Sequence, residues 1–410
     1  MGWLNIYAAV YNEEHQNIFD TTQKYGKQLL WIGGAGIIAF AVLLIDAGFY
    51  TVFAYGFYGV LLLLCILVPY LGREIKGSRS WFGFGGFGVQ PAEFMKFATN
   101  LALAKFLSNE QIIINQRFRL RLRDLIKNYK NTFFALLILG APLLIIKVLQ
   151  DETGLAIVFV AFIVVLYREG LSVGFIIFGL LAAILFVLSL IVTQTTTLII
   201  VLGAISLSAF LFIPRNRRNL LVVALAFAGA SSVVLGTNYV YEHLEQHQKG
   251  RIDVLLGRGQ VDLKKEGYNV NQAKIAIGSG GFTGKGYLQG TQTKYDFVPE
   301  QDTDFIFCTV GEEWGFLGSA IVILLQLFLI LRVIFLAERQ RSAFSRIYGY
   351  GVASALFFHL AVNIGMNIGL MPVIGIPLPF FSYGGTSLWS FTILLFIFIK
   401  LDANRLLILR

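Results

Sequence analysis

One polar stretch, Gly267–Gly318, carries most of the residues in this chain that could do chemistry. It is rich in glycine and holds two lysines, Lys274 and Lys285, followed by acids that include Asp302 and Asp304 just before an apolar run. Polar loops between apolar blocks are a common location for function. Lysines on a glycine-rich backbone suit an anionic group, and a carboxylate at a membrane edge could accept a proton. These residues predict a site for an anionic, lipid-linked substrate.

Asp304 also has a purely structural interpretation. It follows Thr303, a residue type that often caps helices, and it opens the apolar run FIFCTV. An acid in the first turn of a helix can simply complement the helix dipole. From the residues alone, Asp304 could therefore be either a proton acceptor or a partner of the helix dipole.

A second pair of ionisable residues lies inside an apolar block. Pro91 suits the first position of a helix, which places Glu93 and Lys96 three residues apart on one face. Charged side chains within a membrane span are costly and by default functional. The alternative is a pair that only orients the helix.

Three other segments have a functional and a structural interpretation. Asp151, beside Lys147 at the end of an apolar block, could bind substrate or be a solvated charge, and Glu152 is an equal candidate for that role. The run GSGGFTGKG lacks the spacing and the Ser or Thr of a Walker motif, so it could cradle a diphosphate or form ordinary turns. Prolines and glycines at 372–385 exclude a regular helix, so this segment either re-enters the membrane to wall the site or has a wholly structural role.

The composition excludes an ordinary soluble domain. Of 410 residues, 56% are hydrophobic and 14% are charged, and the mean hydropathy is +0.71. Soluble domains carry about 25% charged residues. The net charge of +9 sits mostly in short loops between apolar blocks, so we expect membrane orientation rather than a nucleic-acid partner. No cofactor or metal site is expected, and a need for a divalent cation is left open.

Apolar blocks of about the 20 residues that cross a bilayer recur along the chain. They predict an all-α, polytopic integral membrane helical bundle formed by the single domain 1–410, with a large extracytoplasmic loop at 241–314. Met1–Val10 is too short to span and is expected to be the outer half of a truncated first helix that begins upstream. Eleven complete spans are expected at 28–45, 52–71, 91–107, 133–149, 154–167, 171–193, 197–213, 219–237, 315–337, 347–368 and 385–401.

The basic loops predict which side of the membrane each segment occupies. Arginines gather at 117–123, at 215–218 and at 339–346, which alternation of the spans places on one side. Short loops rich in Lys and Arg are cytoplasmic. Counting outward then puts the loop 241–314, the other suspected motifs and the active site on the outer face, with the C-terminus in the cytoplasm.

Three separated motifs resemble the SEDS family, named for shape, elongation, division and sporulation. The large loop of the family is similar to QAKIAIGSGG, GKGYLQGTQ, TDFIF and GEE in the segment 272–313. The family's C-terminal signature is similar to the segment 363–387, which ends in SYGGTS. Gln90-Pro91-Ala92-Glu93 matches a third motif, with Ala where Ser is usual. Family members have ten spans, so the pair at 197–237 looks like an inserted helix pair.

The resemblance implies roles for individual residues. Asp304 lies in the Thr-Asp-Phe run that holds the family's essential Asp, which makes it the expected catalytic base. Glu93 and Lys96 match an intramembrane acid and base that face a central cavity, and we include both in the catalytic set. The chain lacks the Pro of the family's Gln-Pro-Asp run, so Asp151 aligns less securely. The expected substrate-binding residues are Lys274, Lys285, Gln272, Gln289, Asp151, Ser382 and Tyr383.

The function implied by the resemblance is polymerisation of lipid II, the undecaprenyl-diphosphate-linked disaccharide pentapeptide. This peptidoglycan glycosyltransferase would build glycan strands on the outer face of the inner membrane during elongation. A class B penicillin-binding transpeptidase and other elongation-complex membrane proteins are the expected partners. A lipid II transporter (flippase) and a scaffold without chemistry are the alternatives. A transporter needs polar groups through both leaflets, whereas the informative residues here cluster on one side, which favours the enzyme.

Overall fold

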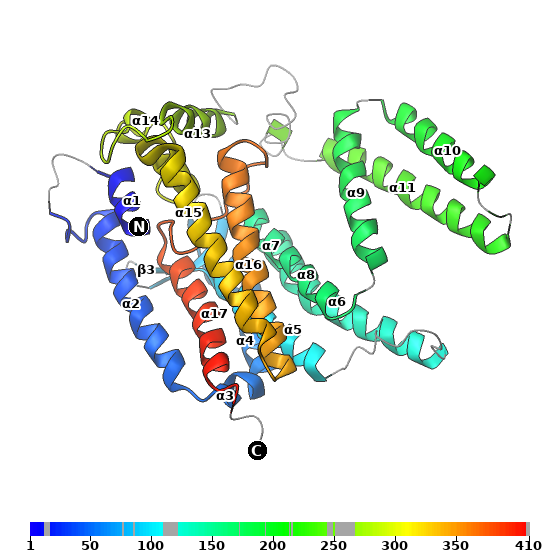
Figure 1. The fold of residues 1–410 in the computed structure, drawn as a ribbon, viewed down its shortest axis with the longest axis horizontal. Coiled ribbons are helices and arrows are strands. Elements are labelled where there is room, and N and C mark those ends of the chain that lie inside the picture. Colours follow the sequence, from blue (N-terminus) through cyan, green and yellow to red (C-terminus); the bar gives the residue numbers. More distant parts are fainter. Residues whose placement is uncertain are drawn as a thin grey trace. The chain divides into compact units, whose positions relative to one another are not determined.

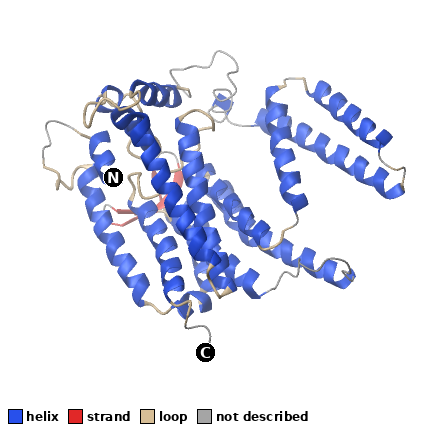
Figure 2. Ribbon diagram, viewed as in Figure 1, coloured by secondary structure: helices blue, strands red, loops and turns tan. Residues whose placement is uncertain are grey.

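The computed structural model describes most of the chain, and it is largely helical (Figures 1 and 2). The predicted basic loop at 110–121, Arg215 and much of the large loop lie outside the described residues. The described residues are 1–11, 17–75, 78–84, 87–109, 122–171, 173–192, 194–212, 214, 216–243, 249–250 and 267–406.

Two compact units divide the chain, and the larger one comprises Met1–Gly170 and Tyr268–Arg410. It holds every residue of the predicted site. Its helices are α1 (Gly2–Ala9), α2 (Lys24–Leu44), α3 (Ala47–Val52), α4 (Ala54–Leu71), α5 (Pro91–Asn109), α6 (Leu122–Gln150), α7 (Thr153–Val158), η1 (Phe159–Phe162), α8 (Ile163–Arg168), α13 (Tyr268–Ser279), α14 (Thr291–Lys294), α15 (Ile306–Glu338), α16 (Ala343–Asn367) and α17 (Gly385–Ala403).

The centre of this unit is formed by α5 and α16. Helix α16 packs against α5, α15 and α17, and α5 also packs against α4 and α6. In the most apolar 18-residue stretch of α16, 78% of the residues are buried, compared with 22% in the corresponding stretch of α2. Because α5 and α16 are shielded from the surroundings, they can carry polar side chains that a lipid-facing helix would not tolerate.

The second unit, Leu171–Gly267, contains α9 (Val173–Ile191), α10 (Thr195–Phe212) and α11 (Arg217–His243). Helix α11 packs against both α9 and α10. Asn238 of α11 donates a hydrogen bond of 2.7 Å to the hydroxyl of Thr195. The predicted inserted pair at 197–237 corresponds to α10 and α11, and its status as an insertion stays a prediction.

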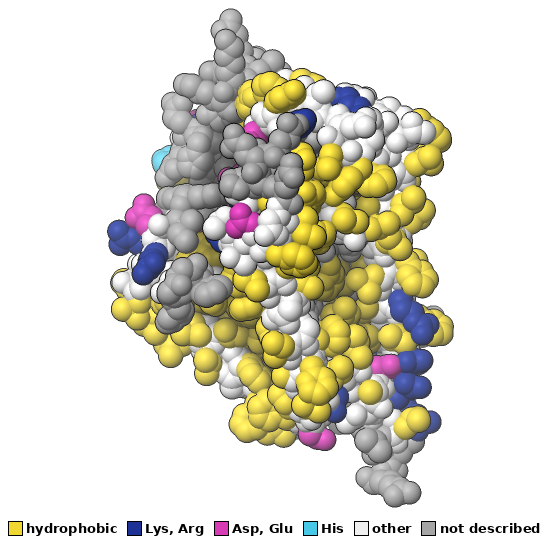
Figure 3. All heavy atoms as spheres, turned by 90° about the vertical axis from the view of Figure 1, so that its left-hand side faces the viewer, with side chains coloured by type: hydrophobic (Ala, Val, Ile, Leu, Met, Phe, Trp, Pro, Cys, Tyr) yellow, Lys and Arg dark blue, Asp and Glu magenta, His cyan; other side chains and the backbone are white. Residues whose placement is uncertain are grey.

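The prediction of a polytopic helical membrane protein is confirmed. Eight helices in the described part of the chain are long and apolar enough to cross a membrane, and the other three predicted spans are α5, the shorter segment Thr153–Arg168 and α9. Many large apolar side chains are exposed, among them Ile37 and Phe40 of α2 at 72% and 65%. Figure 3 shows one face of the molecule on which hydrophobic side chains cover most of the described surface. Only a few charged side chains interrupt that face.

A small antiparallel sheet was not predicted from the sequence. Its strands, β1 (Arg73–Ile75), β2 (Ser78–Phe84) and β3 (Phe87–Val89), follow one another in the order β1-β2-β3 between α4 and α5. Ser78 donates to the carbonyl of Gln150 at 2.8 Å, and Ser80 donates to Glu152 at 2.8 Å. The sheet therefore anchors the start of α5 to the junction between α6 and α7.

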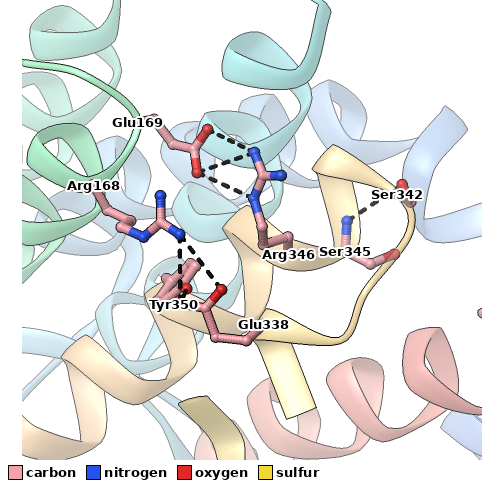
Figure 4. Close-up of polar contacts among 7 residues, drawn as sticks. All are labelled: Arg168, Glu169, Glu338, Ser342, Ser345, Arg346 and Tyr350. Carbon is pink, nitrogen blue, oxygen red and sulfur yellow. Dashed lines mark hydrogen bonds and ion pairs between the residues drawn. The ribbon is translucent and has the colours of Figure 1, made fainter. Parts of the chain in front are cut away.

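Ion pairs fasten the far ends of α15 and α16 to α8 (Figure 4). Arg346 lies 3.0 Å from Glu169, and Arg168 lies 3.4 Å from Glu338, which also accepts a hydrogen bond from Tyr350. These contacts hold the bundle at the end of α15 that is opposite to Asp304. They are well placed to keep α16 rigid.

Candidate functional site

Asp304 lies in a tight turn just before α15. The carbonyl of Glu300 accepts hydrogen bonds from the backbone N–H groups of Thr303 and Phe305, each at 3.1 Å. Helix α15 begins at Ile306 with Phe305 at its N-cap, and the first turn contains no acid. The hydroxyl of Thr303 bonds to Glu300 instead of capping. The structural interpretation of Asp304 as a first-turn acid behind a capping Thr303 is therefore wrong.

Two asparagines of α16 fix the backbone of Asp304. Asn363 and Asn367 donate to the Asp304 carbonyl at 2.8 Å and 3.2 Å. Asn363 also donates to the carbonyl of Ile376 at 2.8 Å. Both asparagines are fully buried, so these bonds are shielded from water. The turn with Asp304 is thus attached to α16, the most buried of the candidate membrane spans.

The proline-rich segment between α16 and α17 encloses the turn from the other side. Ser382 donates to the carbonyl of Thr303 at 2.6 Å, and the backbone N–H of Tyr383 donates to the carbonyl of Asp302 at 2.8 Å. Gly375 has φ of +70°, and a Cβ placed there would lie 3.3 Å from Oδ2 of Asp304. Ser382 and Tyr383 therefore position the turn, and Gly375 keeps space beside the carboxylate.

Glu93 and Lys96 form a buried ion pair on α5. The Lys96 Nζ lies 2.6 Å from Glu93 Oε2, and the two side chains are 1% and 4% exposed. Phe391 of α17 presents its ring 4.1 Å from Nζ, and Ser390 donates to the Glu93 carbonyl at 2.5 Å. The pair thus faces neighbouring helices in this structure. Charges so far from water are costly unless they are paired, which both of these are.

His359 is a site residue that sequence reasoning missed. Its Nε2 lies 3.5 Å from Lys96 Nζ, and its Nδ1 lies 3.0 Å from the carbonyl of Pro377. Because a carbonyl only accepts, the proton belongs on Nδ1, which leaves Nε2 free to accept from Lys96. The only sequence signal for His359 was an ionisable residue inside a span.

His359, Asn363 and Asn367 form one ladder on α16. They are four residues apart, so they share a face, and all three are fully buried. The ladder contacts Lys96 at one end and the Asp304 carbonyl at the other. The two parts of the predicted catalytic set are therefore joined by one face of α16, along which His359 and Asn367 are eight positions, or about 12 Å, apart.

Lys274 and Gln272 lie on α13, which packs against the first turns of α15. Lys274 is exposed, and its Nζ is 3.2 Å from the position that a Cβ on Gly369 would take. Gly369 lies two residues after Asn367, the last residue of α16, so Lys274 lies on the side of the bundle that holds Asp304. Gln272 is half-buried on the same helix.

Lys285 has a different environment. It lies 2.7 Å from Glu312, whose side chain is completely buried, and it also donates to Thr291 at 2.8 Å. Glu312 accepts further bonds from the backbone N–H groups of Gln292 and Thr293, each at 2.9 Å. This carboxylate organises the glycine-rich loop, and Lys285 is its counter-charge.

We therefore expect Lys285→Met to destabilise the protein. The change would leave the buried charge of Glu312 with neutral donors only, at a cost of roughly 1–3 kcal/mol. Lys274→Met is the matched control, because Lys274 is exposed and should leave the melting temperature unchanged. Thermal unfolding of both variants in detergent tests this. An unchanged melting temperature for Lys285→Met would instead favour the predicted substrate-binding role.

The glycine-rich loop also needs small residues where it touches α15. A Cβ on Gly280 would lie 1.9 Å from the carbonyl oxygen of Gly311, whereas one on Gly278 would meet nothing within 4 Å. Gly280→Ala should therefore lower stability by about 1–3 kcal/mol, and Gly278→Ala should not. Limited proteolysis of the loop would detect the difference. Equal protection in the two variants would contradict this packing.

Gln289 and Asp151 have no observed link to Asp304. Gln289 is exposed, and its backbone N–H donates to Gly286 at 3.1 Å. Asp151 has φ of +52°, is 63% exposed and pairs with Lys147 at 2.6 Å. Their substrate-binding roles stay predictions. Among the described side chains, no three from His, Cys, Asp and Glu gather as a metal site would require.

Sequence and structure comparisons agree on one group of proteins. The family model FtsW/RodA/SpoVE, described as cell cycle protein, matches residues 1–197 and 176–406. The chain is 30% identical to peptidoglycan glycosyltransferase RodA of Treponema pallidum, over 99% of this chain and 95% of that protein. It is also 30% identical to peptidoglycan glycosyltransferase MrdB of Escherichia coli, over 81% of this chain and 72% of that one.

Solved structures share the fold. One neighbour comes from a structure described as the structural coordination of polymerization and crosslinking by a peptidoglycan synthase complex. It has a TM-score of 0.68 at 26% identity and covers 98% of this chain and 94% of that chain. The rod shape determining protein RodA of Thermus thermophilus has a TM-score of 0.59 at 24% identity, with 98% and 92% covered.

Proposed function

The chain belongs to the FtsW/RodA/SpoVE family of cell cycle proteins and is a peptidoglycan glycosyltransferase, and we propose that it extends glycan strands from lipid II with Asp304 as general base. The observation that carries this assignment is the double attachment of the Asp304 turn. Asn363 and Asn367 hold the Asp304 carbonyl from α16, and Ser382 holds Thr303 from the proline-rich segment. A general base must be preorganised in this way to act on a bound hydroxyl.

The reaction needs one base and one displacement. The acceptor hydroxyl loses its proton to Asp304 as its oxygen bonds to the anomeric carbon of the donor sugar. The bond between that carbon and the diphosphate oxygen breaks, and the lipid diphosphate leaves. An α-linked donor then gives a β-linked product with inversion, and no covalent enzyme intermediate forms. Lys274, which is exposed on α13 near Gly369, is the cation best placed to stabilise the departing diphosphate.

Glu93 and Lys96 support the site from within the bundle. Their charges are buried, and their link to Asp304 runs through His359 and the α16 ladder. In this role Lys96 keeps the ladder and the proline-rich segment in one arrangement, because His359 contacts both Lys96 and Pro377. We therefore assign the pair to positioning and to the electrostatic field of the site.

The proposed setting is the outer leaflet of the inner membrane. The basic loops predict a cytoplasmic C-terminus and an extracytoplasmic turn at Asp304. A class B penicillin-binding protein is the proposed partner, since a structural neighbour belongs to a peptidoglycan synthase complex. Lipid II would then be consumed on the outer face of the membrane, where the cell wall is assembled.

A lipid II transporter is the alternative that an experiment must separate from the enzyme. Proteoliposomes with the purified protein and its partner can be given lipid II in the outer leaflet alone. In vesicles whose protein is oriented with the Asp304 loop outward, the proposal predicts glycan strands outside and no transfer of lipid II to the inner leaflet. Transfer without polymerisation would favour the transporter.

A further inference from the structure

A polar pocket of about 850 Å³ opens beside the turn that holds Asp304. Its walls come from three separate parts of the chain: residues 9–11 at the end of α1, residues 23–24 at the start of α2, and residues 294–296 and 298–302 at and after the end of α14. The last wall ends at Asp302, two residues before Asp304. The pocket therefore reaches the segment that contains the proposed base, and its last lining residue is two positions from Asp304 along the chain.

The wall after α14 presents an aromatic ring and acids to the pocket. Tyr295 lines it and is 66% exposed, with its ring 6.3 Å from that of Phe297 at 62°. Asp296 and Glu300 have backbone φ angles of +54° and +56°, a conformation that residues other than glycine rarely adopt. Such strain persists only where the surroundings fix it, and it is frequent at functional sites.

An ion pair to the start of α2 and a hydrogen bond within this wall hold two of its acids in place. Lys24 lies 2.9 Å from Asp302, whose side chain is 5% exposed. The carboxylate of Asp296 accepts a hydrogen bond of 2.7 Å from the side-chain amide of Gln301. The pocket therefore combines an exposed aromatic face with carboxylates, two of which are held in place, and with the ammonium groups of Lys24 and Lys294.

This combination suits a saccharide. One face of a pyranose ring is lined with C–H groups that pack on an aromatic ring, while its hydroxyls donate to carboxylates. Acidic groups on the sugars would meet Lys24. A lipid tail would find too little apolar surface here, and the phosphates of a nucleotide would meet three acids beside two lysines.

We propose that this pocket holds the growing glycan strand next to Asp304 between additions, with Tyr295 as its stacking platform. The inference rests on the proposed polymerase function. A strand retained here keeps its end at high effective concentration beside the next lipid II, so successive additions occur before release. The pocket would then set the length of the strands rather than the rate of each bond formation.

Strand length is the first test. The full-length chain with its partner, supplied with lipid II, should make strands that are about threefold shorter when Tyr295 is replaced by Ala, while lipid II consumption stays within about twofold. Tyr295→Phe keeps the ring and should restore the length. Tyr70→Ala, which removes a ring that is 75% exposed at the end of α4, is the matched control. An unchanged length distribution in Tyr295→Ala overturns the proposal, as does loss of all polymerisation.

Binding without catalysis is the second test, and it separates this proposal from the function it rests on. The probe is a soluble, fluorescently labelled glycan strand that retains the lactyl carboxylates and lacks the peptides. It should bind full-length Asp304→Asn in nanodiscs, and adding Tyr295→Ala should weaken binding about tenfold, equivalent to about 1.4 kcal/mol. Equal binding by the two proteins overturns the pocket assignment even if polymerisation is normal. Tyr295-dependent binding by a protein that does not polymerise would support the pocket while the enzyme assignment failed.

Discussion

Removing both charges of the α5 pair, with Glu93→Gln and Lys96→Met together, should lower polymerisation by about 100-fold, the typical effect of losing a preorganised electrostatic contribution, while the protein still folds. Replacing a buried ion pair by uncharged side chains of similar size is often neutral or stabilising. A single change would leave the other charge buried and unpaired, at a cost of about 3–5 kcal/mol. The double variant therefore isolates the functional contribution from stability.

The measurement is the rate of lipid II polymerisation, paired with the melting temperature. A stable double variant with near wild-type activity would show that the pair only orients α5. The exchange Glu93→Lys with Lys96→Glu gives a further test, because it keeps a pair but sets a carboxylate against His359 and the Phe391 ring. We expect the exchanged protein to be inactive, because a glutamate at position 96 cannot donate the hydrogen bond that Lys96 makes to His359.

Asp304→Asn should have the largest effect of any single substitution. The two side chains are nearly isosteric, so the bonds that Asn363, Asn367 and Ser382 make to the turn, which involve backbone carbonyls, stay intact. A general base contributes about 10²- to 10⁴-fold, and we expect a loss in that range. A residue that only complements a helix dipole would cost about 0.3–1 kcal/mol of stability and little activity.

Asp302→Asn is the matched control. It removes an acid two residues away that pairs with Lys24, which is 49% exposed, so the loss is screened by solvent. The Asp302 carbonyl that bonds to Tyr383 is unaffected. We expect activity within about threefold of wild type, because no proton transfer is lost. If Asp302→Asn lost most of its polymerisation activity and Asp304→Asn lost little, Asp302 rather than Asp304 would be the general base.

Sequence patterns predicted most of the bundle because each span is a local signal. The length of a span can be predicted from its own apolar residues, and the i,i+3 spacing of Glu93 and Lys96 predicts that they share one face of a helix. The structure confirms that these two residues meet, at 2.6 Å. Local patterns were also sufficient to place Asp304 between the polar loop and α15.

The contacts that define the site join residues far apart in the chain, and no local pattern encodes them. Lys285 and Glu312 pair across 27 positions, and His359 meets Lys96 across 263. The pairing of Lys285 with Glu312 could not be predicted from the loop that contains Lys285, and its substrate-binding role stays a prediction. The small sheet between α4 and α5 was missed because a short aromatic strand with glycine turns is a weak signal beside long apolar spans.

The central claim is that this chain itself forms glycosidic bonds at Asp304. The most direct measurement compares purified wild-type protein and Asp304→Asn, each reconstituted with a partner whose transpeptidase nucleophile has been removed, on labelled lipid II. We predict long glycan strands from the wild-type protein and none from the folded, partner-bound variant. Strands from Asp304→Asn at a near wild-type rate would contradict the account.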